Sequence, residues 1–279
     1  QCLGRECPQF AECFITRMRE RADAADVVVV NHHLLCADAS VRQGDFGAVI
    51  PVCDLAVIDE AHQLEDVVTQ YFGVSVSTYR LDEFVRDALQ SVASVPASEG
   101  RKAIALQHAI GDVERAAHRL FDCARQESAR QRGGDRTTLT PDSAARLSDQ
   151  GTIVEEELDR LISAIKAFEP VPDDVKAILM RTVALREDVR ILVAADDPAF
   201  VHFIESRGRG VALRAAPIDV SALVRDKVIG DRYATVLTSA TLTVAGAFDY
   251  VQGRLGLATA KTLRLPSEFD FRTQALIYL

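Results

Sequence analysis

Three short apolar runs, each ending abruptly in polar residues, constrain the fold of this 279-residue chain more than any other feature. The runs at 27–30, 55–58 and 235–237 show no alternation between apolar and polar positions. Such runs are typical of strands that are buried on both faces in a parallel sheet covered by helices. The polar clusters that follow them are 31–33, 59–62 and 238–241. Because the chemistry of open α/β sheets lies beyond the carboxyl ends of the strands, we expect these clusters to share one site.

The middle of the chain, from about residue 80 to 195, has the spacing of helices instead. Apolar residues recur there at steps of three and four, the pattern of antiparallel helix bundles. The four seams are Leu81, Val85, Ala88 and Val92; Leu106, Ile110, Val113, Ala117, Leu120 and Ala124; Val154, Leu158, Leu161, Ile165 and Phe168; and Val175, Ile178, Thr182, Leu185, Val189 and Leu192. We expect a helical domain inserted between the second and third strands, then a β-hairpin with strands at 201–205 and 211–215.

The composition is that of a globular chain, with 48% hydrophobic and 26% charged residues, which excludes a disordered or collagen-like protein. No apolar stretch reaches the roughly 18 residues of a membrane span, and no signal peptide is evident, so we expect a cytosolic protein. The net charge of −9 argues against a surface that coats nucleic acid, although it permits a local basic groove. The chain begins with Gln1 and stops inside the apolar run 275–279, which has the pattern of an interrupted strand. We therefore expect a piece of a longer protein.

The cluster Asp59-Glu60-Ala61-His62 directly follows an apolar run. An aspartate at a strand end is placed to hold the magnesium ion of a bound nucleotide, which is the Walker-B role. A neighbouring carboxylate can orient and deprotonate the water that attacks the γ-phosphate. The structural alternatives are an acidic helix N-terminus for this cluster and a helix N-cap for residues 238–241. The position directly after a four-residue apolar run favours a nucleotide site.

Three of the six cysteines, Cys2, Cys7 and Cys13, are bunched as C-x4-C-x5-C. Without a secretory context, such spacing indicates a metal or cluster site before disulfides. Sets of four thiolates hold [4Fe–4S] clusters, and Cys7-Pro8 resembles a ferredoxin ligand run. The alternative is a zinc site with Cys36 or Cys53 as the fourth ligand. Both of those residues flank apolar runs and have the setting of core thiols.

Together these motifs resemble the DinG/XPD family of iron–sulfur DNA helicases, in helicase superfamily two. Residues 59–62 are similar to its DEAH box, and the cysteine cluster, residues 25–35 and residues 238–242 match its neighbouring elements. Residues 264–270 resemble a further family element, with Glu268 where proline is usual. The sequence Asn-His-His-Leu-Leu at 31–35 favours the bacterial DinG-like branch of the family.

The resemblance implies an α/β fold built on a P-loop NTPase (RecA-like) motor domain with a parallel sheet. The implied domains are an iron–sulfur segment at 1–26, a discontinuous first motor domain at 27–79 and 200–279, and an all-helical arch domain at 80–199. The matching residues would then bind ATP, Mg²⁺ and a [4Fe–4S] cluster. Cys2, Cys7 and Cys13 would be three of the four cluster ligands, with the fourth outside this chain.

The resemblance also implies roles for the residues at the strand ends. Asp59 would coordinate Mg²⁺, and Glu60 would be the general base of ATP hydrolysis. His62 would link the nucleotide to Ser239 and Thr241, which would relay the nucleotide state towards DNA.

The implied function is that of a fragment of an ATP-dependent 5′-to-3′ DNA helicase. It would couple ATP hydrolysis to translocation on single-stranded DNA and to strand separation at forked or duplex DNA, in the bacterial cytoplasm near the nucleoid, with a role in DNA repair. Arg17, Arg19 and Arg21 are candidates for phosphate contacts. No G-x-x-x-x-G-K-[ST] phosphate loop occurs among the 279 residues, so we expect them to be inactive alone. Alternatives are a nucleic-acid-binding or redox-sensing iron–sulfur module with an inactive motor, which intact Asp59 and Glu60 argue against, and a nuclease-fused relative.

Overall fold

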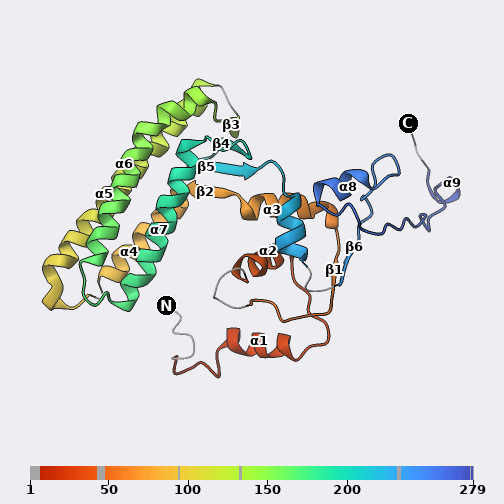
Figure 1. Cartoon of the computed structure of the whole chain (residues 1–279), viewed down its shortest axis with the longest axis horizontal. Helices are drawn as coiled ribbons and strands as arrows, with labels where there is room; N and C mark the ends of the chain where they lie inside the picture. The colour runs from red at the N-terminus through yellow and green to blue at the C-terminus, as the bar shows by residue number, and fades with distance from the viewer. Residues whose placement is uncertain are drawn as a thin grey trace. The chain divides into compact units, whose positions relative to one another are not determined.

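The chain folds into two compact units in the computed structural model, which describes residues 7–42, 48–93, 95–131, 134–230, 234–276 and 278 (Figure 1). The first unit comprises residues 1–68 and 219–279, and the second comprises residues 69–218. The structure is mixed α/β, with one parallel strand pair and one antiparallel sheet. The assignment of residues 1–26, of 27–79 with 200–279, and of 80–199 to three named domains stays a prediction.

The first unit is built around two parallel strands. Its elements are α1 (Phe14–Asp23), α2 (His32–Val41), β1 (Leu55–Ile58), the 3-10 helix η2 (Ala61–Gln63), the start of α3 (Leu64–Phe72), the π-helix η4 (Leu223–Ile229), β6 (Ala234–Leu237), α8 (Asp249–Arg254) and α9 (Phe271–Gln274). β1 and β6 pair from Leu55 with Ala234 to Ile58 with Leu237. Two of the three predicted parallel strands are therefore confirmed.

The predicted strand at 27–30 is wrong. These residues adopt no regular structure, and the side chains of Val27 and Val29 are 78% and 91% exposed. The preference of β-branched residues for strands comes from packing against neighbouring strands, and this run pairs with no strand in the described part of the chain. The C-terminal apolar run likewise forms no strand at residues 275, 276 and 278, while 277 and 279 lie outside the described residues.

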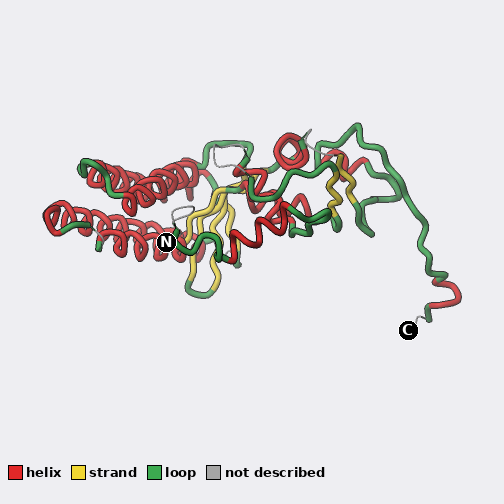
Figure 2. Tube along the Cα trace, turned by 90° about the horizontal axis from the view of Figure 1, so that it is seen from below, coloured by secondary structure: helices red, strands yellow, loops and turns green. Residues whose placement is uncertain are grey.

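The second unit combines four long helices with a small sheet, and Figure 2 shows the strands gathered beside the helices. Its elements are β2 (Val74–Ser77), α4 (Thr78–Val92), the 3-10 helix η3 (Ala97–Glu99), α5 (Gly100–Arg130), β3 (Arg136–Thr138), α6 (Pro141–Lys166), α7 (Asp173–Ala194), β4 (Phe200–Arg207) and β5 (Gly210–Pro217). The strand order is β2-β5-β4-β3, and all pairs are antiparallel. The predicted helices and hairpin are confirmed. The hairpin strands β4 and β5 belong to this antiparallel sheet and do not pair with β1 or β6. The sequence did not predict the short strand β3.

The predicted helical seams form the core of the second unit, because every one of their residues is buried. Side chains from one face of the sheet complete this core, among them Ile204 and Leu213. The helix boundaries follow from local sequence. The Thr140 side chain accepts a hydrogen bond from the Ser143 amide, the Ser143 side chain bonds back to Thr140, and Pro141 occupies the first turn of α6. Within the described chain, no helix has both the length and the apolar character that crossing a membrane requires.

An ion pair between the buried Glu127 and the half-exposed Arg146 joins α5 to α6 within this unit. The Arg146 guanidinium donates two hydrogen bonds to the Glu127 carboxylate, at 2.8 and 2.7 Å. Glu127 is only 3% exposed, and the hydrogen bond from Arg146 lowers its pKa to about 2. The carboxylate is therefore charged in the folded chain at neutral pH, and it depends on Arg146 for compensation.

We expect Arg146→Gln to lower the free energy of unfolding by roughly 3 kcal/mol at pH 7, because it removes the guanidinium that is hydrogen-bonded to buried Glu127 and leaves Arg130, 4.0 Å away, as the remaining cation. Since the folded-state pKa is depressed, the stabilisation by the pair is present above the ordinary pKa of 4.5 and is lost as the pH falls towards about 2. The difference between the two proteins should therefore shrink across that range. Urea unfolding followed by far-ultraviolet circular dichroism measures it.

Arg160→Gln is the matched control, because it removes an exposed guanidinium that pairs with Glu157 on the same helix at 2.7 Å. Exposed pairs of this kind contribute about 1 kcal/mol or less. Equal losses in both variants, or a difference that persists at low pH, would contradict the account of Glu127.

Candidate functional site

The carboxyl ends of β1 and β6 bring two of the predicted polar clusters together in the first unit. Ile58 and Leu237 are opposite each other in the register, so both strands end at the same edge. The Thr238 amide donates to the Ile58 carbonyl at 2.9 Å, and the Ala61 amide donates to the Thr238 carbonyl at 3.0 Å. The backbone pairing thus continues past both strands. The expectation that residues 59–62 and 238–241 lie side by side is confirmed.

Asp59 is the first side chain beyond β1. The Thr238 hydroxyl donates to Asp59 Oδ1 at 2.8 Å. This hydrogen bond, aided by the Glu60 amide and by the nearby His32, lowers the pKa of the Asp59 carboxyl below its usual value. The carboxylate is therefore ionised and solvent-accessible at neutral pH. These are the properties of an oxygen ligand for Mg²⁺.

Glu60 has an unusual backbone conformation that aims its side chain towards β6. Its φ of 49° and ψ of 41° lie in the left-handed region, where a residue other than glycine costs roughly 1–3 kcal/mol. Its carboxylate accepts a hydrogen bond from the Ser239 hydroxyl at 3.1 Å. The side chain is 53% exposed, so water can reach the remaining carboxylate surface. Such strain is typical of functional positions held in place by their surroundings.

His62 completes a three-residue contact with Glu60 and Ser239. Its Nδ1 lies 2.8 Å from Ser239 Oγ and 3.1 Å from Glu60 Oε2. When the Ser239 hydroxyl donates to Glu60, the protonated Nδ1 of His62 donates to Ser239. The Thr241 amide also donates to Ser239 Oγ at 3.2 Å. Ser239 is therefore the junction between the DEAH segment and the loop after β6.

His32 is a contact residue that the sequence reasoning undervalued. Its Nε2 donates to the Asp59 carbonyl at 2.9 Å, so the third polar cluster also reaches this edge although the strand before it does not form. Asn31 places His32 at the start of α2, because its side chain accepts a hydrogen bond from the Leu34 amide at 2.8 Å. The Asn-cap directly before His32 is the signal that marks this position.

The cysteines are only partly placed, because Cys2 lies outside the described residues. Cys7 and Cys13 are free and partly exposed. Cys13 is the N-cap residue of α1, and the amides of Thr16 and Ile15 lower the pKa of its thiol. Among the described residues, no three His, Cys, Asp or Glu side chains gather as metal ligands.

The two cysteines of the zinc alternative differ from each other. Cys36 is fully buried in α2, and burial raises the pKa of its thiol to about 11. It is a core thiol, as expected. Cys53 is exposed, so the interpretation of Cys53 as a core thiol is wrong. Its place just before β1 suggested burial, but that end of the strand is solvent-exposed, as Leu55 is 55% exposed.

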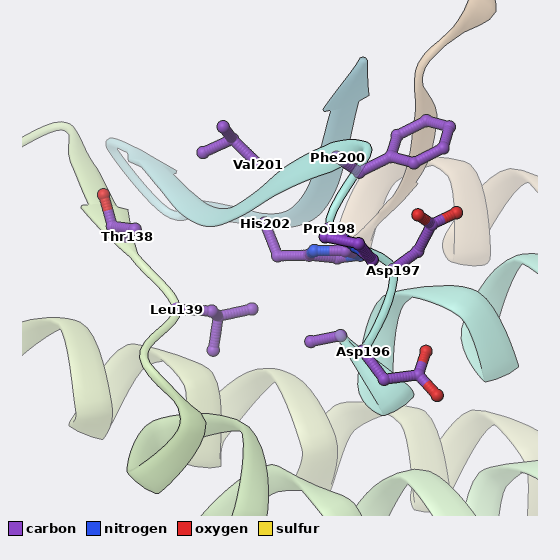
Figure 3. Close-up of a pocket in the computed structure, with 9 residues that line it drawn as sticks. Thr138, Leu139, Asp196, Asp197, Pro198, Phe200, Val201 and His202 are labelled. Atoms are coloured by element: carbon purple, nitrogen blue, oxygen red, sulfur yellow. The ribbon is translucent and has the colours of Figure 1, made fainter. Parts of the chain in front are cut away.

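The second unit has a cavity of about 290 Å³ that none of the predicted site residues lines (Figure 3). Asp196, Asp197, Pro198 and His202 are among the residues that line it. Burial lowers the pKa of His202, so its imidazole is neutral, and its Nε2 has no hydrogen-bond partner among the described residues.

No family model matches the chain. The chain is 30% identical to the ATP-dependent DNA helicase YoaA of Escherichia coli, over 99% of this chain and 42% of that protein. It is 33% identical to the ATP-dependent helicase DinG of Mycobacterium tuberculosis, over 100% of this chain and 40% of that protein. A Bacillus subtilis protein named 3′-5′ exonuclease DinG is 22% identical, over 95% of this chain and 32% of its own length.

The edge formed by β1 and β6 gathers the acidic side chains of Asp59 and Glu60 with the hydroxyls of Thr238 and Ser239. The resemblance to DinG-like helicases is confirmed, because these relatives match the chain from end to end. The chain spans about two fifths of the length of the YoaA and DinG proteins that it matches.

We expect Thr238→Val to raise the pKa of Asp59 towards its ordinary value, because the isosteric side chain removes the hydroxyl that donates to the carboxylate. The sign is fixed, since a hydrogen bond to the charged form lowers the pKa. Carboxyl carbon chemical shifts followed across a pH titration measure this change. Thr273→Val is the control, because Thr273 donates to the distant Asp270 instead. An unchanged Asp59 titration in Thr238→Val would contradict the assignment.

Proposed function

We propose that this chain forms part of an ATP-dependent DNA helicase of the DinG type, which moves 5′-to-3′ on single-stranded DNA and separates strands at forks or duplexes. The single observation that carries the proposal is the hydrogen-bonded contact of Glu60 and His62 with Ser239 at one sheet edge. This contact connects an acidic pair suited to ATP hydrolysis with a loop on a different strand. In this proposal the parallel pair belongs to a RecA-like motor domain, and the helical second unit is the arch domain.

The acidic pair would divide the chemistry of ATP hydrolysis. Asp59, with its lowered pKa, would hold the Mg²⁺ that accompanies the bound nucleotide. Glu60 would accept a proton from the attacking water, because its carboxylate is solvent-accessible and held by Ser239. The ion would supply charge neutralisation for the phosphates, while the chain orients the water and removes its proton.

The same contact gives a physical route from hydrolysis to DNA. When Glu60 takes the proton from water, its carboxylate becomes neutral. The hydrogen bond from the Ser239 hydroxyl then no longer goes to a negative charge. Hydrogen bonds to charged groups are roughly twice as strong as neutral ones, so the link to Ser239 weakens. The loop 238–241 and strand β6 would then shift relative to the DEAH segment. In this way the chain converts a change in protonation into movement of a second element.

The resemblance also implies an iron–sulfur cluster, and the described cysteines fit a thiolate ligand in part. Cys7 and Cys13 are free, and the lowered pKa of Cys13 favours the thiolate that iron requires. In the proposal they hold the cluster together with Cys2 and one cysteine outside these residues. The cluster would cross-link the segment before α1 through its cysteine ligands. Arg17, Arg19 and Arg21 on α1 would then face DNA phosphates.

With these partners the protein would act on DNA, in the cytoplasm and near the nucleoid of a bacterial cell. The rival interpretation, an iron–sulfur module with an inactive motor, does not account for the contacts of Asp59 and Glu60 with the loop after β6. An inactive motor domain would not require Glu60 to be held in a strained backbone conformation.

We expect Glu60→Gln to lower ATP turnover by about 10²- to 10⁴-fold, the usual contribution of a positioned general base, while ATP still binds. The amide keeps the shape and still accepts a hydrogen bond from Ser239, but it cannot take a proton. The test uses the longest native protein that carries these 279 residues, assayed for steady-state hydrolysis with single-stranded DNA beside a nucleotide-binding titration.

Asp66→Asn is the matched control, since it removes an exposed carboxylate from the first turn of α3, close along the chain but outside the contact. It should leave turnover near the native value. Native turnover in Glu60→Gln would remove Glu60 from its proposed role, and equal losses in both variants would point to a general effect of charge.

A further inference from the structure

The sheet of the second unit has one buried face and one face that bears charge. Ile204 and Leu213, at 0% and 1% exposed, belong to the face that packs on the helices. The register places Arg136 opposite Glu205 and Phe203 opposite Arg214, so these four side chains share the other face. We call this set, with Arg207 at the end of β4, the arginine face.

Three arginines of this face converge on one carboxylate. Glu205 lies 2.6 Å from Arg214, 3.1 Å from Arg207 and 3.5 Å from Arg136, measured between guanidinium nitrogens and carboxylate oxygens. Glu205 is only 6% exposed, whereas the side chains of Arg136 and Arg207 are 63% and 75% exposed. The carboxylate therefore fixes the guanidinium groups from below, while their outer edges remain in water.

The arginine face has more positive charge than its own carboxylate can neutralise. Three guanidinium groups around one carboxylate leave a surplus of two positive charges, in a chain whose net charge is −9. Asp135, directly before β3, is the neighbouring carboxylate along the chain, and its backbone carbonyl accepts a hydrogen bond from Ser206. A concentration of positive charge against the overall sign of the protein favours an anionic partner.

An aromatic ring lies among these charges. The Arg136 guanidinium sits 5.3 Å from the centre of the Phe203 ring, and Phe203 is partly exposed on the central strand β4. Planar guanidinium and phenyl groups are the surfaces on which unpaired bases stack, while arginine heads contact phosphates. A protein partner with acidic side chains would use the arginines but has no comparable use for the ring.

We propose that the arginine face is a binding surface for single-stranded nucleic acid, separate from the site of ATP hydrolysis. Arg207 and Arg214 contact phosphates, and a base stacks on the pair formed by Phe203 and Arg136. The choice of DNA as the natural strand rests on the proposed helicase function, but the binding chemistry does not. Strand β4 holds the phosphate and base contacts at a fixed spacing, because the side chains of Phe203 and Arg207 lie on the same face of this strand.

The test is the affinity of the 279-residue chain for a fluorescent oligothymidylate, measured by anisotropy without nucleotide over a series of salt concentrations. The double variant R136Q/R207Q should bind about tenfold more weakly, and its salt slope should be smaller by about 0.7 for each phosphate that the variant no longer binds. The fold should survive, because Arg214 still pairs with Glu205 at 2.6 Å. Circular dichroism checks this point.

Phe203→Leu separates stacking from charge. It should weaken binding to the single strand by up to about tenfold, with an unchanged salt slope and less effect on a duplex of the same sequence. The matched control is R160Q/R190Q, which removes two exposed arginines from α6 and α7 that pair with Glu157 and Glu187. This control should retain the native affinity.

Native affinity in R136Q/R207Q, or an equal loss in R160Q/R190Q, would overturn the proposal. Displacement of the strand by polyglutamate at matched charge, together with no effect of Phe203→Leu, would overturn it in favour of an acidic protein partner. Because no nucleotide is present, these results are independent of Glu60. Failure here leaves the proposed ATP hydrolysis standing, and failure of the Glu60 test leaves this binding surface standing.

Discussion

The continuation of backbone hydrogen bonds past the ends of β1 and β6 is the constraint on which the candidate site depends. The bonds from Thr238 to Ile58 and from Ala61 to Thr238 hold two segments together that are about 180 residues apart in the chain. They place a hydroxyl beside each carboxylate. Asp59 accepts a hydrogen bond from Thr238, and Glu60 accepts one from Ser239. Without that fixed register, the acidic pair would be two solvated side chains at a strand end.

The conformation of Glu60 shows how this constraint becomes a site. A left-handed glutamate is unfavourable alone, and it persists because the Ala61 amide and the Glu60 carboxylate both bond to the loop after β6. His32 adds a third support through the Asp59 carbonyl, from the start of α2. The second unit follows the same principle at Glu205, where one buried carboxylate orients three arginines.

The predictable parts of the molecule are those where one pattern decides the outcome. The stepped apolar seams predicted the buried positions of α4 to α7 because a helix in a bundle buries a single stripe. The prediction of a strand at 27–30 is wrong because a run of valines specifies a strand only when a neighbouring strand is present to pair with it. The DEAH segment and the loop at 238–241 were recognisable by their residues, but the junction at Ser239 and the contact of His32 depend on side-chain geometry that the sequence does not display.

The proposed coupling between the acidic pair and the loop after β6 depends on Ser239, so Ser239→Ala is its most direct test. The substitution removes the hydroxyl shared by Glu60 and His62 but leaves the general base in place. ATP turnover and DNA unwinding should be measured on the same native protein that carries this chain. The account predicts that unwinding per ATP hydrolysed falls by about tenfold or more, while turnover falls much less. An unchanged ratio of unwinding to turnover would contradict it.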